Sequence, residues 1–325
     1  RRPPRSTPSN SSAASDVYKR QVFNRTVSAN LGMSYSISNV FTEAGLDNIM
    51  RWVPFDLDDR TLRNRVKNKM IRPTTIPQTP EDLILEQAIA REAIRLAFIQ
   101  HKSFATILKG VQRVRTIAEV FEQEGKATLV NLLTLDMIIG SGGVLSHAPR
   151  RNQAAMMMLD AFQPEGVTEL TVDSIFMMPQ LGVLSTLHPK AAKEVFDKDC
   201  LIRLGSCIVP SGITKPGKDI MDYTIKFPDG RVEEGALKFG EMKLFPLAVG
   251  QKAEAVLHPH KSCDLGNGKG KKIEVELNGG VVGIILDGRG RPIVLPEDSK
   301  ERVEKLKEWF TVMKLYPQEV IDRFG

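Results

Sequence analysis

Apolar and polar positions alternate with helical spacing in much of the first half of the chain. A long helix is predicted over 80–101, because Thr79 can cap its first turn and proline is tolerated at the first helical position. A second helix is predicted over 60–72, where acidic residues precede basic ones in the order that suits a helix dipole. Residues 22–55 alternate short apolar and polar stretches, which predicts strands with a short helix near 40–52.

The segment 127–184 has the pattern of strand, glycine turn, helix, strand and helix. An apolar run ends at Gly140-Ser141-Gly142-Gly143, which predicts a buried strand that opens into a tight turn. The elements that follow are predicted as a helix over 150–162, a strand over 168–173 and a helix over 178–184.

Beyond Gly212 the pattern changes to short strands with one buried face. Residues 219–295 predict a small antiparallel β domain in which Asp229-Gly230 forms a hairpin turn. The stretch 279–286 is nearly all apolar and predicts a central strand, and a final helix is predicted over 299–314.

The amino-terminal stretch differs from the rest of the chain. Residues 1–21 are rich in Ser, Pro and Arg and lack apolar periodicity, which predicts a disordered tail. Residues 11–21 resemble translated sequencing-adapter read-through, so we interpret the tail as a gene-model artefact. The remaining chain is predicted to divide into an α/β region over 22–208 and a β-rich domain with a carboxy-terminal helix over 209–325.

Charge and composition narrow the classes of function. The net charge is +6, but residues 1–21 contribute +4, so the rest does not suggest a nucleic-acid-binding protein. No apolar run is long enough to cross a bilayer, and no signal peptide is evident. The cysteines suit neither a zinc site nor a disulfide framework, which indicates reduced thiols in a cytoplasmic protein, and no metal site is predicted.

The glycine turn is the strongest candidate for ligand chemistry. Glycines lack a Cβ, so their backbone can approach a nucleotide closely. The P-loop is excluded because no Lys-Ser/Thr follows the glycines, and the dinucleotide fingerprint is excluded because its third glycine is missing. A tight structural turn without a ligand remains an alternative interpretation.

Longer segments around the turn resemble a known superfamily. Residues 136–151 and 173–184 resemble the adenosine motif and the second connecting motif of the acetate/sugar kinase–Hsp70–actin superfamily. More narrowly, the chain resembles the methylaspartate (glutamate) mutase accessory proteins, the MutL or GlmL family, whose relatives also serve D-ornithine aminomutase. This resemblance extends from about Val22 to the carboxyl terminus and includes 68–79, 162–168, 198–205 and 279–283.

The resemblance implies a fold, a cofactor and a partner. It implies an α/β, actin/Hsp70-like (ribonuclease H-like) ATP-binding lobe over 22–208, with ATP and Mg²⁺ as cofactors. The implied function is an ATP-dependent reactivating factor for an adenosylcobalamin-dependent aminomutase, with the mutase subunits as partners and the β domain as a candidate docking surface. It leaves the catalytic residues unassigned and implies that the nucleotide-binding residues are Gly140, Ser141, Gly142, Gly143, Ser146 and Gly182.

The chain departs from the superfamily pattern at its amino-terminal end. Nothing in 1–60 resembles the first phosphate motif, so we expect that the amino-terminal lobe is missing and that ATPase activity belongs to the complete protein. Two alternatives stay open: a small-molecule kinase of the same superfamily, and a non-catalytic scaffold with a vestigial nucleotide fold.

Overall fold

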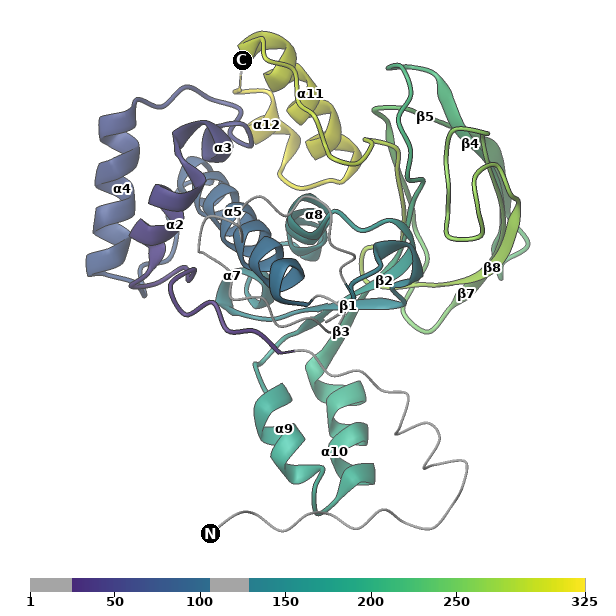
Figure 1. Ribbon diagram of the computed structural model, residues 1–325, viewed down its shortest axis with the longest axis horizontal. Coiled ribbons are helices and arrows are strands. Elements are labelled where there is room, and N and C mark those ends of the chain that lie inside the picture. The colour runs from purple at the N-terminus through teal and green to yellow at the C-terminus, as the bar shows by residue number, and fades with distance from the viewer. Residues whose placement is uncertain (1–24, 106–128, 325) are drawn as a thin grey trace, which may run out of the picture.

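The computed structural model describes residues 25–105 and 129–324. Figure 1 shows a body of helices beside one sheet, a second sheet next to it, and a two-helix arm that projects from the body. The tail predicted over 1–21 lies outside the described residues.

The helices of the first part of the chain begin where the sequence predicts. The Asp58 side chain caps α4 by accepting a hydrogen bond from Thr61 N at 2.9 Å. Thr79 caps α5 in the same way, with Asp82 N as the donor at 3.2 Å. Both predicted helices are therefore confirmed. The elements are α2 (Ile37–Ala44), α3 (Leu46–Met50), α4 (Asp59–Ile71) and α5 (Pro80–Phe104).

The strands predicted within 22–55 are wrong for the described part of that stretch. Residues 25–55 contain α2 and α3 and no strand. Ile37, Val40 and Phe41 are buried on one side of α2, in the core cluster that also contains α5 residues. The apolar positions there have the spacing of a helix that packs on other helices. The apolar runs of this stretch are too short to distinguish that helical spacing from the alternation of a strand.

A mixed five-stranded sheet in the order β1-β2-β3-β9-β6 forms the centre of the body. β1 is parallel to β2, with Gly140 opposite Val172, and β3 is parallel to β9, while the other pairs are antiparallel. The strands predicted before the glycine turn and over 168–173 are confirmed as β1 and β2. The strands are β1 (Met137–Gly140), β2 (Gly166–Asp173), β3 (Leu201–Val209), β6 (Met242–Phe245) and β9 (Ile284–Asp287).

A second sheet is antiparallel throughout and has the order β5-β4-β7-β8. The predicted hairpin joins β4 to β5, and its Gly230 has φ +86°, a left-handed conformation that favours glycine. The predicted antiparallel β arrangement is confirmed in this sheet. Its strands are β4 (Asp219–Lys226), β5 (Val232–Lys238), β7 (Lys252–Pro259) and β8 (Ile273–Asn278).

β9 alternates its side chains between two hydrophobic clusters. Ile285 belongs to the cluster formed with the helices, whereas Ile284 and Leu286 belong to the cluster formed with the second sheet. The central sheet therefore has helices on one face and, over β3 and β9, the second sheet on the other. Because β6 and β9 come from beyond residue 209, this sheet contains strands from both sides of the predicted domain boundary.

The remaining helices surround the body or leave it. Residues 143–146 form α7 and residues 151–162 form α8, which packs against α5 and the central sheet. The helix predicted over 178–184 is confirmed as α9, which forms the projecting arm with α10 (Figure 1). No helix in the described ranges is both long and apolar enough to cross a membrane. The bounds are α7 (Gly143–Ser146), α8 (Arg151–Phe162), α9 (Met178–Leu184), α10 (Pro189–Val195), α11 (Ser299–Val312) and α12 (Gln318–Ile321).

Candidate functional site

The glycine turn connects the end of β1 to the start of α7. Gly142 has φ +110°, a conformation that side chains rarely adopt, and its carbonyl oxygen accepts hydrogen bonds from Leu145 N and Ser146 N at 3.1 and 2.9 Å. A Cβ built on Gly142 or Gly143 would meet no atom within 4 Å. This side of the turn is therefore open, and a ligand could approach its backbone.

Gly140 has a different role from the two glycines that follow it. It is buried, and a Cβ at this position would lie 2.9 Å from Leu145 Cδ1 and 2.9 Å from Met158 Sδ. The absence of a side chain lets the end of β1 pack against α7 and α8. Gly140 therefore has a packing role, and it does not lie on the open side of the turn.

The two serines of the predicted site differ in their hydrogen bonding. Ser141 Oγ is buried and has no hydrogen-bond partner among the described residues. A buried polar atom without a partner costs free energy, so Ser141 offers a hydroxyl that a ligand could satisfy. Ser146 Oγ instead donates to the main-chain oxygen of Asp173 at 2.7 Å. Ser146 therefore fastens α7 to the end of β2.

Asp173 connects the turn to the projecting arm. Its side chain is buried and accepts hydrogen bonds from the main-chain amides of Ile175, Met177 and Met178 at 3.1 to 3.3 Å. Because three amides hold this carboxylate at the start of α9, its contacts are those of a helix cap. Glu169 is occupied as well, since Arg203 Nη1 donates to Glu169 Oε1 at 2.6 Å.

Gly182 lies within α9, and the structure does not bring it into the turn. Gly182 is exposed, and a Cβ there would meet no atom outside its own helix within 4 Å. The hydrogen bond from Ser146 to Asp173 joins the two parts of the predicted site indirectly. A role for Gly182 in binding a nucleotide stays a prediction.

Two other places where a ligand could bind, the loop 264–272 and His260, already have partners within the chain. In the Gly- and Lys-rich loop 264–272, Asp264 Oδ1 accepts hydrogen bonds from Gly266 N and Gly268 N at 2.8 and 2.9 Å, so these amides already have a partner. His260 Nε2 lies 3.3 Å from Asp222 Oδ2. Within 25–105 and 129–324, no three His, Cys, Asp or Glu side chains are grouped so that they could hold a metal ion.

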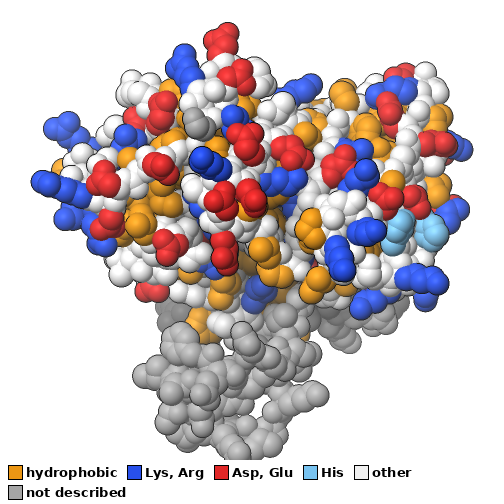
Figure 2. Space-filling view, turned by 90° about the horizontal axis from the view of Figure 1, so that it is seen from above, with side chains coloured by type: hydrophobic (Ala, Val, Ile, Leu, Met, Phe, Trp, Pro, Cys, Tyr) orange, Lys and Arg blue, Asp and Glu red, His pale blue; other side chains and the backbone are white. Residues whose placement is uncertain are grey.

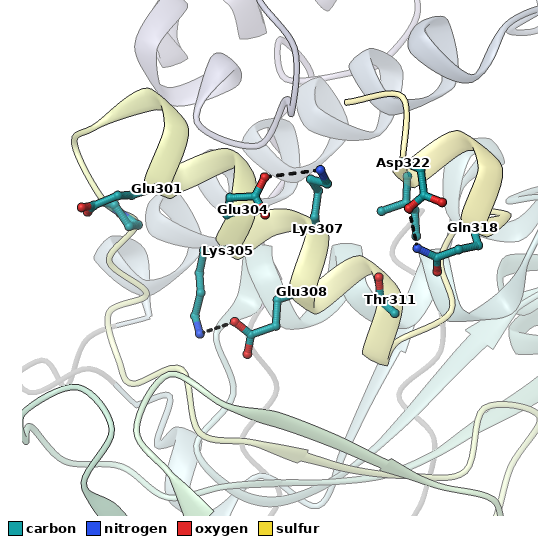
Figure 3. A pocket seen from close by; sticks show the side chains of 10 residues that line it. Glu301, Glu304, Lys305, Lys307, Glu308, Thr311, Gln318 and Asp322 are labelled. Carbon is teal, nitrogen blue, oxygen red and sulfur yellow. Dashed lines mark hydrogen bonds and ion pairs between the residues drawn. The ribbon is translucent and has the colours of Figure 1, made fainter. Parts of the chain in front are cut away.

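Two hollows of the described surface lie away from the glycine turn. One, of about 600 Å³, lies over α11 and α12, and Figure 3 shows Lys305 paired with Glu308 and Lys307 paired with Glu304. Lys305 Nζ lies 2.7 Å from Glu308 Oε2, and Lys307 Nζ lies 3.3 Å from Glu304 Oε1. These pairs lie along a single helix, which is typical of a solvated surface. The other hollow, of about 590 Å³, lies between α4 and α5.

The structure contains a buried group of charged residues that the sequence does not predict. Asp287 and Arg289 belong to the stretch 287–290, whose sequence predicts a turn; both are buried, and Arg289 reaches Asp160 of α8. The pattern Asp-Gly-Arg-Gly-Arg offered a weak signal, since charges recur there at alternate positions directly after a buried strand. These side chains are occupied with one another and hold the fold together.

Comparison with known proteins addresses the family. A family model described as MutL protein matches residues 5–200 of the chain. The match begins inside the stretch 1–21 and leaves 201–325 outside it. No curated protein and no solved structure matches the chain. Since the matched residues make up more than half of the chain, it belongs to the MutL family, the accessory proteins of glutamate mutase.

Proposed function

We propose that this member of the MutL family is an ATP-dependent accessory or reactivating factor for an adenosylcobalamin-dependent aminomutase, such as glutamate mutase or D-ornithine aminomutase. The observation that carries the ATP dependence is the turn 140–143. Its backbone is open at Gly142 and Gly143, and beside them Ser141 holds a buried hydroxyl without a partner in the described structure. An open backbone and an unsatisfied hydroxyl are what a nucleotide would require of this turn.

The arrangement of elements around the turn supports a nucleotide-binding lobe. β1 and β2 are parallel neighbours, and the chain between them forms the glycine turn, α7 and α8. Ligands commonly bind outside the carboxyl ends of the strands in such α/β units. We therefore propose that this region is part of an actin/Hsp70-like lobe, with the turn on the adenosine side of its cleft.

A ligand can drive a conformational change only if it binds two conformations of the protein with different affinity. ATP, with Mg²⁺, would supply this difference in binding free energy. In this chain Gly142 and Gly143 would let the backbone lie against the nucleotide, and Ser141 would donate a hydrogen bond to it. The hydroxyl of Ser146 would pass a displacement of α7 to Asp173, which caps the arm. A short path of hydrogen bonds thus joins the proposed nucleotide site to the part that projects from the body.

The proposal is tested by titrating the complete protein with Mg²⁺-ATP in a calorimeter. Gly142→Asp places a carboxylate on the open side of the turn and should weaken ATP binding at least ten-fold. Gly230→Asp is the matched control, because Gly230 also has a positive φ and open space around its Cβ position. The Gly230→Asp variant should bind ATP with the same affinity as the wild type. Equal affinities of wild type and Gly142→Asp would remove the turn from the proposal.

The mutase part of the proposal needs a separate measurement. Phosphate release from ATP by the complete protein should increase when an inactivated cobalamin mutase is added, and the activity of the mutase should return. Transfer of phosphate to a small acceptor without any effect on the mutase would instead indicate a kinase. A chain that binds no ATP but still binds the mutase would be a non-catalytic scaffold.

A further inference from the structure

The outer helix α4 combines an unusual charge with an apolar groove. α4 has five basic residues and one acidic residue, and only Leu62 and Val66 among its side chains are buried. Figure 1 places α4 at the edge of the body, and Figure 2 shows Lys and Arg side chains gathered on the same side. A solvated helix face usually mixes both signs of charge, so this one differs from an ordinary surface.

The groove lies between α4 and α5 and is also lined by the connection 72–79. Its volume is about 590 Å³, and its floor consists of buried aliphatic side chains. Ile71 and Ile76 border it and are 71% and 72% exposed. Two isoleucines this exposed beside an apolar groove form a surface suited to an apolar side chain of a partner. The floor residues are Ile37, Val66, Leu85 and Ile89.

Some of the charged side chains at the groove form ion pairs and one does not. Arg65 pairs with Asp82 at 2.8 Å and Lys69 pairs with Glu86 at 2.6 Å, so these four groups hold α4 against α5. Arg72, which also lines the groove, makes no side-chain ion pair or hydrogen bond within the described structure. The groove therefore presents one uncompensated positive charge next to its apolar floor.

The unpaired cations extend beyond the groove. Arg60 and Lys67 are exposed and, like Arg72, form no ion pair with another described residue. From Arg60 to Arg72 the distance along the helix is about 18 Å at 1.5 Å per residue. A small anion would contact one of these groups, whereas a segment of polypeptide could contact all three.

The outer face of the second sheet offers a contrast. Some of its exposed charges are paired, as in Lys252 with Glu276 and Lys272 with Glu274, and the exposed charges without an ion pair include both signs, as in Lys226 and Glu254. The four-stranded sheet thus resembles an ordinary solvated face, whereas α4 presents unpaired charge of one sign and exposed apolar side chains.

We propose that α4 and the groove behind it are a docking surface for an acidic amphipathic segment of a partner protein. Apolar side chains of that segment enter the groove between Ile71 and Ile76, and its carboxylates pair with Arg60, Lys67 and Arg72. The inference does not depend on nucleotide binding, because the surface belongs to elements other than the glycine turn.

The probe is a fluorescent synthetic peptide of about 18 residues, long enough to follow α4 as a helix, with leucines on one face and glutamates elsewhere. Fluorescence anisotropy should show binding to the 325-residue chain that weakens as salt increases. Lys67→Glu/Arg72→Glu should raise the Kd roughly ten-fold, since two attractive charges become repulsive. Ile71→Asp should raise it similarly through loss of the apolar contact.

The matched control is Lys261→Glu/Lys269→Glu, which changes the net charge equally at two exposed lysines of a loop elsewhere on the chain. It should leave the Kd unchanged. Equal binding of a peptide with serines in place of the leucines would overturn the proposal, because the attraction would then need no groove. Failure of the peptide to bind, with vesicles of phosphatidylserine binding instead through Lys67 and Arg72, would assign the surface to membranes and also overturn it.

Discussion

Arg289 Nη1 donates a hydrogen bond to Asp160 Oδ1 over 2.7 Å, and both side chains are buried. Asp160 also accepts a hydrogen bond from Arg91 Nε at 2.6 Å, and Asp287 accepts from Arg289 and Arg291. The two aspartates therefore join α5, α8 and the segment after β9. Segments that lie far apart in the sequence meet in a single buried network.

Removal of one member of this network should destabilise the protein strongly. In Asp160→Ala, Arg91 and Arg289 lose their shared partner while they remain buried, and we expect the free energy of unfolding to fall by about 3–5 kcal/mol. Urea denaturation followed by circular dichroism measures this change. Glu276→Ala, which breaks the exposed pair with Lys252, should change the free energy by less than about 0.5 kcal/mol. A loss below about 1 kcal/mol in Asp160→Ala would contradict the role assigned to the network.

The same network should give the stability a defined dependence on pH. Burial alone would raise the pKa of Asp287, but the charges and hydrogen bonds of Arg289 and Arg291 outweigh it and hold the pKa well below its usual range. An unfolded aspartate titrates near about 3.9, so the stabilisation is fully present above that pH and is lost as the pH falls towards the folded pKa.

Comparison of the wild-type chain with Asp287→Asn at several pH values tests this linkage. The difference in the free energy of unfolding should be constant between about pH 5 and 7 and should shrink below about pH 4. A difference that stays constant down to about pH 2.5 would show that Asp287 titrates alike in both states.

The sequence predicts those elements whose stabilising contacts are between residues close together in the chain. It does not predict the features that depend on residues far apart in the sequence. The start of α5 depends on neighbours along the chain, and Thr79, Pro80 and Asp82 sufficed to predict it. β9 begins later than the predicted strand over 279–286, and the residues before it lie close to β3, where a Cβ on Gly280 would be 2.2 Å from the Leu204 carbonyl carbon. This glycine marks a place where two segments lie against each other, and the close approach depends on a residue far away in the sequence.

The candidate site shows the same limit. The turn itself was predicted, because an apolar run that ends in glycines has a local cause. The burial of Arg289 was not predicted, because one of the two aspartates that pair with it, Asp160, is on α8 and pairs in turn with Arg91 of α5. Likewise, the sequence did not reveal that Ser141 would lack a partner while Ser146 has one.

The cysteines give a chemical test of packing. Burial raises the pKa of the Cys207 thiol to about 12, and this effect outweighs the opposing effect of the Arg291 charge, which is larger than the increase that Asp287 adds. Because the thiolate is the reactive form, Cys207 should resist iodoacetamide in the native protein up to about pH 9 and react rapidly in urea. Mass spectrometry of the alkylated peptides measures both rates. Native alkylation at the unfolded rate would mean that β3 is not packed as described.

The link between the turn and the arm can be tested through Asp173. Asp173→Ala removes the acceptor of three amides at the start of α9, and we expect loss of about 1–2 kcal/mol of local stability. α9 and α10 bury little else than Leu181 and Ala192, so this loss should appear as faster amide hydrogen exchange throughout the arm.

Asp298→Ala provides the matched control for this experiment, because Asp298 caps α11 by accepting a hydrogen bond from Glu301 N at 2.9 Å. It should accelerate exchange at the start of α11 and leave the arm unchanged. Ser146→Ala tests the second half of the link, since it removes the hydroxyl that binds the Asp173 carbonyl while the carboxylate cap stays in place. If ATP slows exchange in the arm of the wild-type chain but not in Ser146→Ala, the hydroxyl carries the coupling. Equal slowing in both would place the coupling in another contact between α7 and β2.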